Sequence, residues 1–309
     1  MDALSRWIVA EAQQMGFDAC GIARATVLEK ESAHVEQWLD GQNEGEMGYL
    51  TRNREKRYDP RLLVEGTKSI VTILYNYFPK QKLHDTDNFK IAKYAYGADY
   101  HDVLKRKMRQ LLERIETQTG KLDGCRVFVD SAPVLDRAWA VKCGLGFIGK
   151  NTTLIHPKKG SFFFIGHLFL PLVLTETGQE LPNRCGRCTK CLDACPTGAL
   201  EAPFHIDARK CISYLTIEYK GSLDGFDRSE FNDWIYGCDI CQDVCPYNRF
   251  SLPHSETDFQ PSEKLLAMRK SDWMSLKRDD FEELFKHSAV KRAGFEGLKR
   301  NIDFISKES

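Results

Sequence analysis

Four cysteines lie within eleven positions of the segment NRCGRCTKCLDACPTGAL, residues 183–200, and a proline follows the last of them. Their spacing is C-x2-C-x2-C-x3-C-P, on Cys185, Cys188, Cys191 and Cys195. Bacterial proteins with two 4Fe–4S clusters use this spacing, and the fourth cysteine ligates the other cluster. Zinc sites usually take two separated pairs of ligands, and disulfide frameworks are typical of short secreted chains. The spacing therefore predicts iron–sulfur clusters, whose chemistry is the transfer of single electrons.

A second cysteine segment nearly repeats the first. In YGCDICQDVCPYN the spacing is Cys238-x2-Cys241-x3-Cys245 followed by proline, and the position of the missing first ligand holds Ile235, which cannot bind iron. Cys211 is the remaining cysteine between the two segments and completes a set of eight. The alternative for Cys211 is a free buried thiol. Ferredoxin symmetry predicts two ligand sets: Cys185, Cys188, Cys191 and Cys245 for one cluster, and Cys195, Cys211, Cys238 and Cys241 for the other.

The other three cysteines, Cys20, Cys125 and Cys143, stand alone without metal-ligand spacing, and we expect buried structural thiols there. An odd total of eleven cysteines, eight of them committed to iron, indicates a reducing compartment. The sequence shows no apolar signal region, no twin-arginine start and no long apolar run. We therefore expect a cytoplasmic protein with no membrane association.

The elements that must position these groups follow from length, hydrophobic periodicity and turn residues. The 309 residues leave room for more than one domain, and the balance of 44 basic against 44 acidic residues gives no sign of nucleic-acid binding through bulk charge. We predict an α/β domain over 1–175, a ferredoxin-like domain with two 4Fe–4S clusters over 176–252, and a charged C-terminal helical segment over 253–309.

Within these segments, individual elements are marked by local patterns. Helical patterns cover 2–16, 31–42, 101–120, 134–146 and 271–285, and strand patterns cover 19–25, 69–78, 125–130 and 160–174. The last strand pattern fits two strands or one long bent strand. The segment GLGFIGKN, residues 144–151, is glycine-rich, but its spacing matches no nucleotide-binding fingerprint. We expect its backbone to approach a bound group closely, and the alternative is an ordinary tight turn.

Several segments, in chain order, resemble the epoxyqueuosine reductase family. They are GEMGYL at 45–50, KRYDPRLL at 56–63, YAYGADYHDVL at 94–104 and VDSAPVLDRAWAVKCGLGFIGKNT at 129–152, followed by the cysteine pattern. The resemblance implies a cobalamin-dependent oxidoreductase with two 4Fe–4S clusters that completes queuosine at the wobble position of tRNA. The family commonly continues into HEAT-like helical repeats, whereas this sequence ends at NIDFISKES. The resemblance is therefore to a short form that lacks most of those repeats, and the alternative is a longer protein of which this sequence is a trimmed part.

Reduction of an epoxide to an alkene removes oxygen as water and takes two electrons and two protons, so an acid must protonate the leaving oxygen. The resemblance implies Asp130 as that acid, just past the carboxyl edge of a strand, where active-site residues of α/β layers commonly lie. Desolvation by corrin and substrate would raise its pKa. The alternative is that Asp130 caps the following helix. Asp99 and His101 are further proton donors to consider, and Asp136 with Arg137 fits a surface ion pair.

For cobalamin, the resemblance implies contacts from Arg57, Asp130, Gly149, Lys150, Asn151 and Thr152. An arginine, a lysine and loop N–H groups suit the phosphate and the amide side chains of that cofactor. The sequence contains no D-x-H-x-x-G motif, which is the signature of a histidine lower ligand, so we expect no protein histidine below cobalt. The alternative for Arg57 is a solvated charge beside Asp59.

For tRNA, the basic candidates are the run KRKMR at 105–109 and Lys291, Arg292, Lys299 and Arg300. Such runs are usually solvated helix faces, which is the alternative here. Candidates for stacking on splayed anticodon bases are Tyr214, Tyr219 and Tyr236, with core packing as the alternative for each. The clusters also imply an external electron donor such as a ferredoxin or flavodoxin, and we expect a monomer.

Two other classes of protein share parts of this pattern. A corrinoid reductive dehalogenase also combines cobalamin with two clusters, but it usually carries a twin-arginine signal, and none is present here. A ferredoxin-type electron-transfer protein would hold iron and sulfide without a corrinoid. Bound corrinoid therefore separates that carrier from an enzyme.

Overall fold

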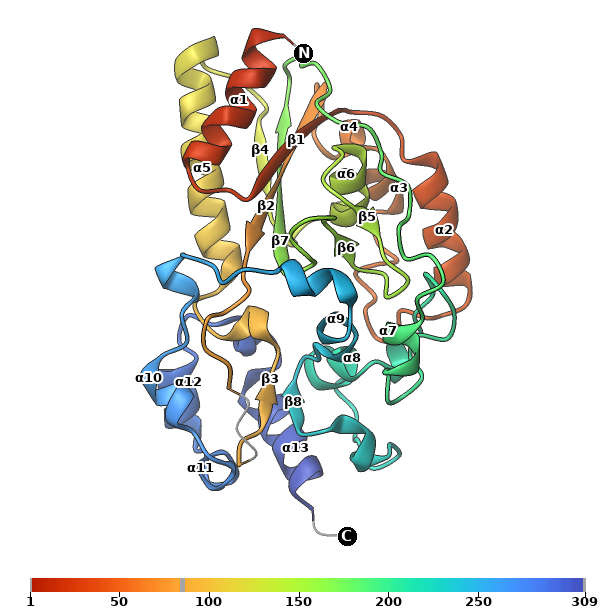
Figure 1. Cartoon of the computed structure of the whole chain (residues 1–309), viewed down its shortest axis with the longest axis vertical. Coiled ribbons are helices and arrows are strands. Elements are labelled where there is room, and N and C mark those ends of the chain that lie inside the picture. The colour runs from red at the N-terminus through yellow and green to blue at the C-terminus, as the bar shows by residue number, and fades with distance from the viewer. Residues whose placement is uncertain (1, 84–86, 308–309) are drawn as a thin grey trace.

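The computed structural model describes residues 2–83 and 87–307. Figure 1 shows a sheet with helices against both faces in the upper half of the molecule, and short helices around the cysteine segments in the lower half. The sheet consists of β1 (Ala19–Arg24), β2 (Ser69–Asn76), β4 (Arg126–Phe128) and β7 (Phe163–Leu170), in the order β1-β2-β7-β4. These layers confirm the α/β architecture that the sequence predicts for the first segment.

Every pairing in this sheet is antiparallel. The strands therefore share no common carboxyl edge, and the argument that placed Asp130 at such an edge is wrong. The position of Asp130 depends instead on cross-strand neighbours. Phe128, the last residue of β4, pairs with His167 of β7, which pairs in turn with Thr72 of β2. This row of residues crosses the sheet from a point two residues before Asp130.

The sheet is buried on both faces. It is covered by α1 (Ala3–Gln14) and α5 (Tyr100–Thr119) on one face and by α6 (Asp136–Lys142) on the other. Alternate residues of β2 enter the two cores, because Val71 and Ile73 pack with α1 and α5 whereas Ile70 and Leu74 pack with α6. Burial on both faces explains why β2 is a continuous apolar run rather than an alternating one.

Local signals account for several element ends. Asp2 and Asp99 accept hydrogen bonds from backbone N–H groups in the first turns of α1 and α5. Gly120 follows α5 with a φ of +85°, a conformation that glycine adopts without steric cost. The helices expected over 2–16, 31–42 and 101–120 are present, the second as α2 (Glu29–Asp40).

Other element expectations need correction. The segment 160–174 forms one strand, β7, which ends before Pro171. The helix expected over 134–146 is only α6, and the helix expected over 271–285 is two helices, α11 (Lys270–Met274) and α12 (Arg278–Leu284). Ser275 ends α11 with its hydroxyl donating to the carbonyls of Ser271 and Asp272, so local side-chain bonding competes with a longer helix.

Residues between β2 and α5 leave the sheet and join the lower half. There β3 (Lys90–Ile91) pairs in parallel with β8 (Trp234–Tyr236), which precedes the second cysteine segment. The ammonium of Lys93, two residues after β3, lies 3.3 Å from a carboxylate oxygen of Asp239 and 2.6 Å from one of Asp243. The first segment thus contributes a strand to the cysteine region, and the domain boundaries at 175 and 252 stay predictions.

The two cysteine segments fold alike. Each contains one helical turn, α7 (Lys190–Asp193) in the first and α9 (Ile240–Asp243) in the second, and the two turns lie against each other. A Cys-Pro pair follows each turn, and the carbonyls of Cys195 and Cys245 accept hydrogen bonds from the N–H groups three residues later, at 3.2 and 2.9 Å. This repetition has the pseudo-symmetry that two-cluster ferredoxins require.

The remaining helices surround these parts. They are α3 (Arg54–Tyr58), α4 (Pro60–Leu63), α8 (Ile212–Ile217), α10 (Glu263–Ala267) and α13 (Gly294–Ser306). Asn301 of α13 donates to the carbonyls of Thr216 and Ile235 at 2.8 and 2.9 Å, which ties the last helix to α8 and β8. No helix in the described ranges has the length and apolarity needed to cross a membrane.

Candidate functional site

Asp130 lies in the loop between β4 and α6 in a left-handed conformation, with a φ of +49°. This conformation is costly for a residue other than glycine, and such residues gather at functional sites. Oδ2 accepts a hydrogen bond from the hydroxyl of Tyr100, and 63% of the Asp130 side chain remains accessible. The helix that follows begins at Asp136 and receives no side-chain cap. The capping alternative for Asp130 is therefore wrong.

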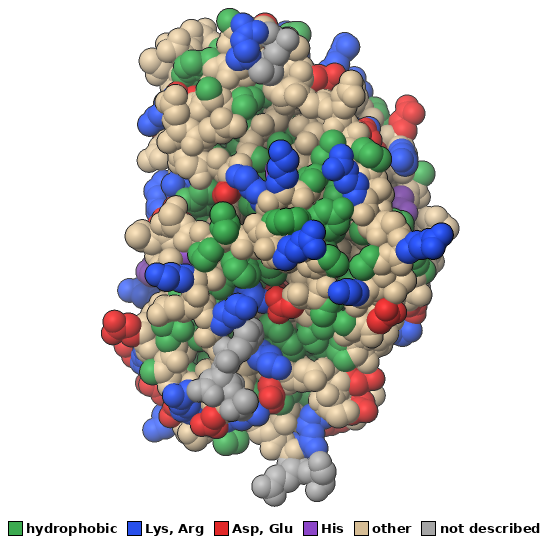
Figure 2. Space-filling view, viewed as in Figure 1, with side chains coloured by type: hydrophobic (Ala, Val, Ile, Leu, Met, Phe, Trp, Pro, Cys, Tyr) green, Lys and Arg blue, Asp and Glu red, His purple; other side chains and the backbone are tan. Residues whose placement is uncertain are grey.

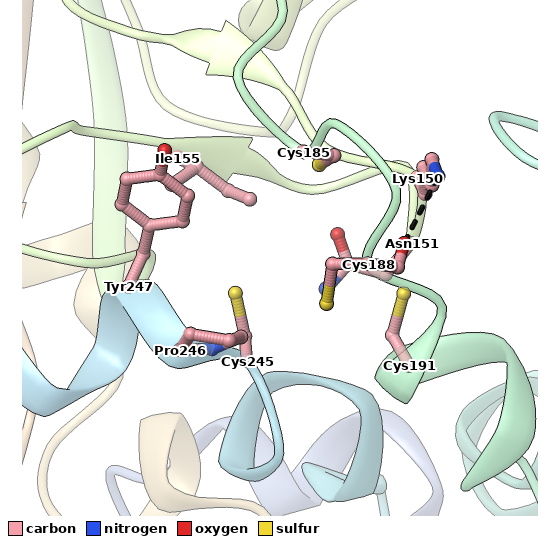
Figure 3. Close-up of a pocket in the computed structure, with 9 residues that line it drawn as sticks. All are labelled: Lys150, Asn151, Ile155, Cys185, Cys188, Cys191, Cys245, Pro246 and Tyr247. Carbon is pink, nitrogen blue, oxygen red and sulfur yellow. Dashed lines mark hydrogen bonds between the residues drawn. The ribbon is translucent and has the colours of Figure 1, made fainter.

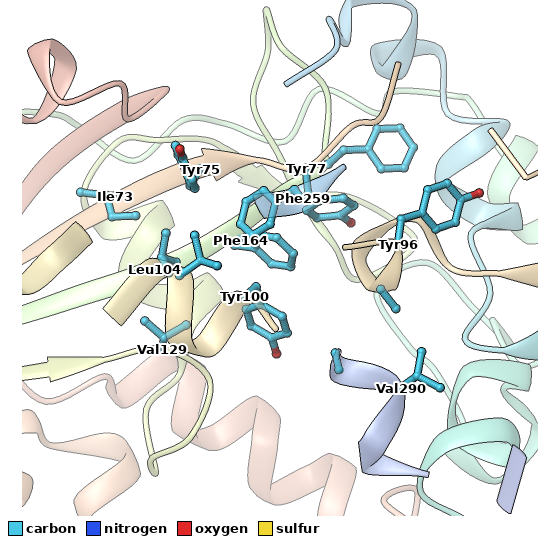
Figure 4. Close-up of a cluster of buried hydrophobic side chains, with 14 of the residues drawn as sticks. Ile73, Tyr75, Tyr77, Tyr96, Tyr100, Leu104, Val129, Phe164, Phe259 and Val290 are labelled. Atoms are coloured by element: carbon cyan, nitrogen blue, oxygen red, sulfur yellow. The ribbon is translucent and has the colours of Figure 1, made fainter. Parts of the chain in front are cut away.

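The start of α5 presents three polar groups beside Asp130. His101 Nε2 lies 4.0 Å from Asp130 Oδ2, and His101 Nδ1 lies 2.7 Å from Asp99 Oδ1. The ring of Tyr100 stacks on Phe164 with centroids 4.2 Å apart and on His101 with centroids 4.1 Å apart. Figure 4 shows the Tyr100 hydroxyl pointing out of the buried cluster that holds its ring. The polar ends are thus held in place by packing of the rings.

The surroundings of Asp130 raise the pKa of its carboxyl above the ordinary value. Desolvation contributes most, because neighbouring protein crowds the group although one side stays open, and the negative charge of Asp136 adds to it. The hydrogen bond from Tyr100 and the charges of His101 and Arg137 act in the opposite direction. A carboxyl that keeps its proton to higher pH suits a general acid.

Asp136 does not form a surface ion pair with Arg137, which corrects the sequence expectation. Its Oδ1 lies 3.1 Å from Nε2 of His167, a fully buried residue, and His167 Nδ1 lies 3.0 Å from the hydroxyl of Thr72. Arg137 turns the other way and donates to the carbonyl of Thr152. Neighbours in a helix point in different directions, so adjacency in sequence does not make a pair.

We expect two substitutions to move the pH dependence of turnover in opposite directions. An acid must be protonated to act, so the rate falls as pH rises through the pKa of Asp130. Tyr100→Phe removes a hydrogen bond that stabilises the carboxylate and should shift this fall to higher pH. Asp136→Asn removes a like charge and should shift it to lower pH. Single-turnover rates across pH measure both shifts.

Tyr96→Phe is the matched control, because its hydroxyl accepts from the backbone N–H of Leu83 and does not face Asp130. Its pH profile should match that of the unmodified protein. Shifts of Tyr100→Phe and Asp136→Asn in the same direction would contradict the electrostatic account of the Asp130 environment.

Arg57 is buried rather than solvated beside Asp59. Its Nη2 donates to the carbonyl of Tyr49 at 3.0 Å, while its Nε is buried and has no hydrogen-bond partner. Asp59 instead holds Arg61 through two bonds of 2.8 Å, so the alternative for Arg57 is wrong. Desolvation lowers the pKa of Arg57. A buried N–H without an acceptor is costly unless a bound group supplies one.

The glycine-rich loop joins the sheet half to the cysteine segments. It is held in the hairpin formed by β5 (Phe147–Ile148) and β6 (Leu154–Ile155). A Cβ on Gly149 would lie only 2.5 Å from Ile155 Cδ1. Thr152 has a φ of +63°, which is rare for a β-branched residue, and offers its carbonyl to Arg137.

Two side chains of this loop donate hydrogen bonds to the cysteine segments. Lys150 Nζ donates to the carbonyls of Gly186 and Cys188 at 2.8 and 2.9 Å. Asn151 Nδ2 donates to the carbonyl of Cys241 at 3.3 Å. The expectation that both side chains contact cobalamin stays a prediction.

Four cysteines of the first predicted set line one hollow, which Figure 3 shows with their sulfur atoms around it. The hollow has a volume of about 40 Å³, whereas one water needs roughly 10–15 Å³. It therefore has room for more than a single ion. The lining residues are Lys150, Asn151, Ile155, Cys185, Cys188, Cys191, Cys245, Pro246 and Tyr247.

The other four cysteines form a second group. Burial raises the pKa values of the Cys238 and Cys241 thiols, and the neighbouring charges of Cys195 and Cys211 raise them further. In the first group, the charges of Cys185 and Cys245 likewise raise the pKa of the Cys191 thiol. The two groups have the same members as the two sets expected from sequence. Within the described ranges, no set of three or more His, Cys, Asp or Glu side chains is arranged to hold a single metal ion.

The three isolated cysteines lie apart from these groups. Cys20 and Cys143 are buried, as expected for structural thiols, whereas Cys125 is only half-buried. The Cys143 sulfur lies 3.3 Å from the Thr72 hydroxyl. Burial raises the pKa of Cys143 to about 12, so its thiol stays protonated at neutral pH.

Most basic side chains proposed from sequence for tRNA are engaged within the protein. Arg106 pairs with Asp258 at 2.5 Å and Lys107 with Glu256 at 3.2 Å. Near the C-terminus, the remaining pairs are Lys291 with Glu282, Arg292 with Glu218 and Lys299 with Asp303. Arg300 donates to the backbone carbonyls of Leu215, Tyr219 and Gly221. These contacts favour the structural alternative.

The three tyrosines proposed for stacking on tRNA bases are also engaged within the protein. Tyr214 and Tyr236 are buried, with hydroxyls that donate to the backbone or accept from it: Tyr214 accepts from the N–H of Glu46, and Tyr236 donates to the carbonyl of Ala289. Tyr219 is half-buried beside Tyr214 and Arg300. Core packing is therefore their role in this structure.

Comparison with known proteins finds family matches in two parts of the chain. A family model described as "Epoxyqueuosine reductase QueG, DUF1730" matches residues 57–131, and a "4Fe-4S double cluster binding domain" matches residues 184–248. An epoxyqueuosine reductase of Cellulophaga algicola is 50% identical over 298 residues, which cover 96% of each chain. The chain belongs to the epoxyqueuosine reductase family. The resemblance inferred from the motifs is confirmed, and the double-cluster match lies within the expected ferredoxin-like segment.

Two further comparisons extend this result. An epoxyqueuosine reductase of Pseudomonas aeruginosa is 40% identical over 295 residues, which cover 94% of this chain and 81% of that one. A crystal structure of an epoxyqueuosine reductase with an epoxyqueuosine-modified tRNA stem loop matches with a TM-score of 0.88 and 30% identity, covering 98% of this chain and 80% of that one. The chain therefore corresponds to about four fifths of these longer relatives.

Sequence reasoning missed two residues of the site. Tyr100 lies inside the quoted segment YAYGADYHDVL, yet nothing in that segment shows that its hydroxyl reaches Asp130. His167 stands alone in the apolar strand FFIGHLFL. An ionisable residue in a strand buried on both faces needs a buried partner, and that signal was available from the sequence.

Proposed function

We propose that the protein reduces epoxyqueuosine to queuosine at the wobble position of tRNA, using cobalamin supplied with electrons by two 4Fe–4S clusters. Family membership and the related structure with a modified tRNA stem loop support the substrate. The observation that carries the proposal is Asp130, an accessible carboxyl with a raised pKa, in a chain that also brings together two groups of four cysteines. In this proposal the carboxyl supplies protons, and the cysteines bind the clusters that carry electrons.

The overall reaction sets what the site must deliver. An epoxide, two electrons and two protons become an alkene and water, with both carbon–oxygen bonds to the leaving oxygen broken. The electrons come from an external one-electron donor and pass through the clusters. Asp130 protonates the leaving oxygen, because an alkoxide departs poorly without a proton.

The residues present fit a corrinoid. Arg57 offers a buried Nε–H without a partner, and amide or phosphate oxygens of the cofactor are suitable acceptors for it. The backbone of Gly149 and Thr152 lies in the loop that Arg137 fixes. When bound, cobalamin supplies a strongly nucleophilic reduced cobalt. Two nearby histidines, His101 and His167, are engaged with the carboxylates of Asp99 and Asp136.

The two cysteine groups are assigned as ligands of the two clusters, in the sets expected from ferredoxin symmetry. Their loops are fixed to the sheet half by Lys150, which holds the first group, and by Asn151, which holds the second. One loop therefore contacts both cysteine segments. All eleven cysteines are free of disulfides, which suits assembly in a reducing compartment such as the cytoplasm.

We assign the approach of the tRNA to an open cavity of about 500 Å³ that Tyr49 lines. Tyr49 also lies near Asp130 and Arg57, because the charges of both act on its pKa, which burial raises to about 12. Arg52 and Lys220 bring positive charge to the same cavity. An aromatic ring with cations beside it suits an unstacked nucleotide.

The second proton needs its own source, because Asp130 carries one at a time. His101 Nε2 is 4.0 Å from Asp130 Oδ2, and Asp99 fixes the ring through Nδ1. We assign to His101 the return of a proton to Asp130, either directly after a small movement or through one water. The accessible edge of His101 lets it exchange protons with solvent.

We expect His101→Gln to lower turnover by about two orders of magnitude, the lower end of what a positioned acid–base group contributes. Added imidazole should restore part of the rate, which a purely structural defect would not allow. Asp99→Asn should lower turnover by a smaller factor, since asparagine still caps α5.

His205→Gln is the control, because His205 forms an exposed pair with Glu201 at 3.7 Å away from the cleft. It should turn over normally. If His101→Gln also turns over normally, solvent alone returns the proton and the role assigned to His101 is wrong.

The function itself is tested by anaerobic reconstitution with iron and sulfide, addition of cob(II)alamin, and assay of an epoxyqueuosine-containing tRNA stem loop. Mass spectrometry of the nucleoside should show loss of one oxygen atom. A reconstituted protein that holds both clusters but binds no corrinoid would be an electron-transfer protein, and the proposal would fail.

A further inference from the structure

A group of exposed cations surrounds the first cysteine group. Arg184, Arg187 and Lys190 alternate with Cys185, Cys188 and Cys191 along the chain, and all three cations are exposed. Within the described residues their side chains make no ion pair or hydrogen bond. We call these three side chains with Arg249 the basic rim. Arg249 is exposed and lies over the ring of Phe250, 4.6 Å from its centroid.

The rim forms one surface because the two cysteine segments are joined there. The hydroxyl of Tyr247 donates to the carbonyl of Arg184 at 3.1 Å, which brings the start of the first segment to the end of the second. Figure 2 shows Lys and Arg side chains across the middle of this face, over the region where α9 lies in Figure 1, with few acidic side chains among them.

Acidic residues close to the rim do not neutralise it. Asp193 accepts from the hydroxyl of Thr189 at 2.7 Å, and Asp243 is paired with Lys93. Two apolar side chains lie next to Arg249: Phe250 is 41% exposed and Leu252 is 74% exposed. Exposed apolar groups inside a polar, charged border are the usual anatomy of a protein–protein interface.

The first cysteine group is also the one that reaches the surface. Its hollow is lined by Cys185 and Cys188, and the residues on either side of these two cysteines are exposed. Electron transfer needs close approach of donor and acceptor, so a donor protein has to cover a cluster near the surface. The rim surrounds that place.

We propose that the basic rim with Phe250 and Leu252 is the docking surface for an acidic one-electron carrier protein of the flavodoxin or ferredoxin kind. This inference rests on the proposed function, which needs two electrons delivered singly from outside. Complementary charge speeds the encounter of such partners and orients them. The negative surface of the carrier meets the rim, and its flavin or cluster faces the first cluster.

The test uses the reconstituted holoenzyme with two electron sources. We expect Arg184→Gln with Arg187→Gln, and separately Arg249→Gln, to lower kcat/KM for a reduced flavodoxin by about tenfold or more at low salt. The difference from the unmodified protein should shrink as ionic strength rises. With reduced methyl viologen, a small cation that needs no docking surface, turnover of the tRNA stem loop should be unchanged.

Lys30→Gln with Lys121→Gln is the control, because both lysines are exposed on the sheet half and make no ion pair within the described residues. This control should leave the kinetics with the carrier unchanged. Unchanged carrier kinetics in the rim variants would overturn the proposal. Equal losses with methyl viologen would show that the rim only supports the cluster, and a weaker Kd for the stem loop would assign it to tRNA. Turnover with methyl viologen in the unmodified protein reports on the proposed function separately.

Discussion

Asp130→Asn should lower the rate of epoxide reduction by about two to four orders of magnitude, the range that a positioned general acid contributes. Asparagine has nearly the same shape and keeps an oxygen that can accept the hydrogen bond from Tyr100. It has no acidic proton to give. The loss should therefore appear in the chemical step of a single-turnover assay with the modified stem loop, while corrinoid binding and iron content stay normal.

Asp123→Asn serves as the control, since Asp123 is exposed in the turn before β4 and lies outside the cleft. It should react at the normal rate. Near-normal turnover of Asp130→Asn would move the proton donor to His101, Asp99 or a water. The shifts predicted for the pH profiles of the Tyr100 and Asp136 variants assume that Asp130 is the acid, so they would then not be expected. The two experiments therefore check each other.

The elements of the sheet half could be predicted because each carries its own local signals. Asp99 caps α5 and Gly120 ends it, so the bounds of this helix follow from a few neighbouring residues. The strand order could not be predicted in this way. β7 lies between β2 and β4 although it is the last of these four strands along the chain, and its pairing depends on contacts between distant residues. The antiparallel sheet, and the loss of the carboxyl-edge argument, follow from those contacts.

In the candidate site, too, some features could be predicted from local sequence and others could not. The cysteine groups could be predicted because ligand spacing in the chain sets which thiols a cluster can reach. The partners of Asp136 and Arg57 could not, because they are distant in the sequence and are brought close only by the fold. Asp136 instead reaches His167 across the sheet, and Asp59, the supposed partner of Arg57, caps the next helix. A charged residue near a buried layer pairs with whatever the fold brings to it.

Cys211→Ser should remove one cluster and leave the other, and turnover should be lost with it. Cys211 is the one predicted ligand outside both cysteine-rich segments, and it stands at the start of α8 without a side-chain cap bond. The charge of Cys195 raises the pKa of the Cys211 thiol, so the two sulfur atoms are neighbours in the second group. Iron should fall from about eight to about four atoms per chain. Activity should disappear because electrons entering at the first cluster have no complete path.

Cys125→Ser is the matched control, because Cys125 is half-buried and belongs to neither group. Its iron content should stay at about eight. The spectrum of the cluster that remains in Cys211→Ser should also match that of a protein in which only the first group binds, obtained with Cys238→Ser. If Cys211→Ser keeps all its iron, Cys211 is a free buried thiol and the second cluster takes a ligand from elsewhere. Loss of all iron would instead mean that the two clusters assemble only together, because their ligands are interleaved between the same two segments.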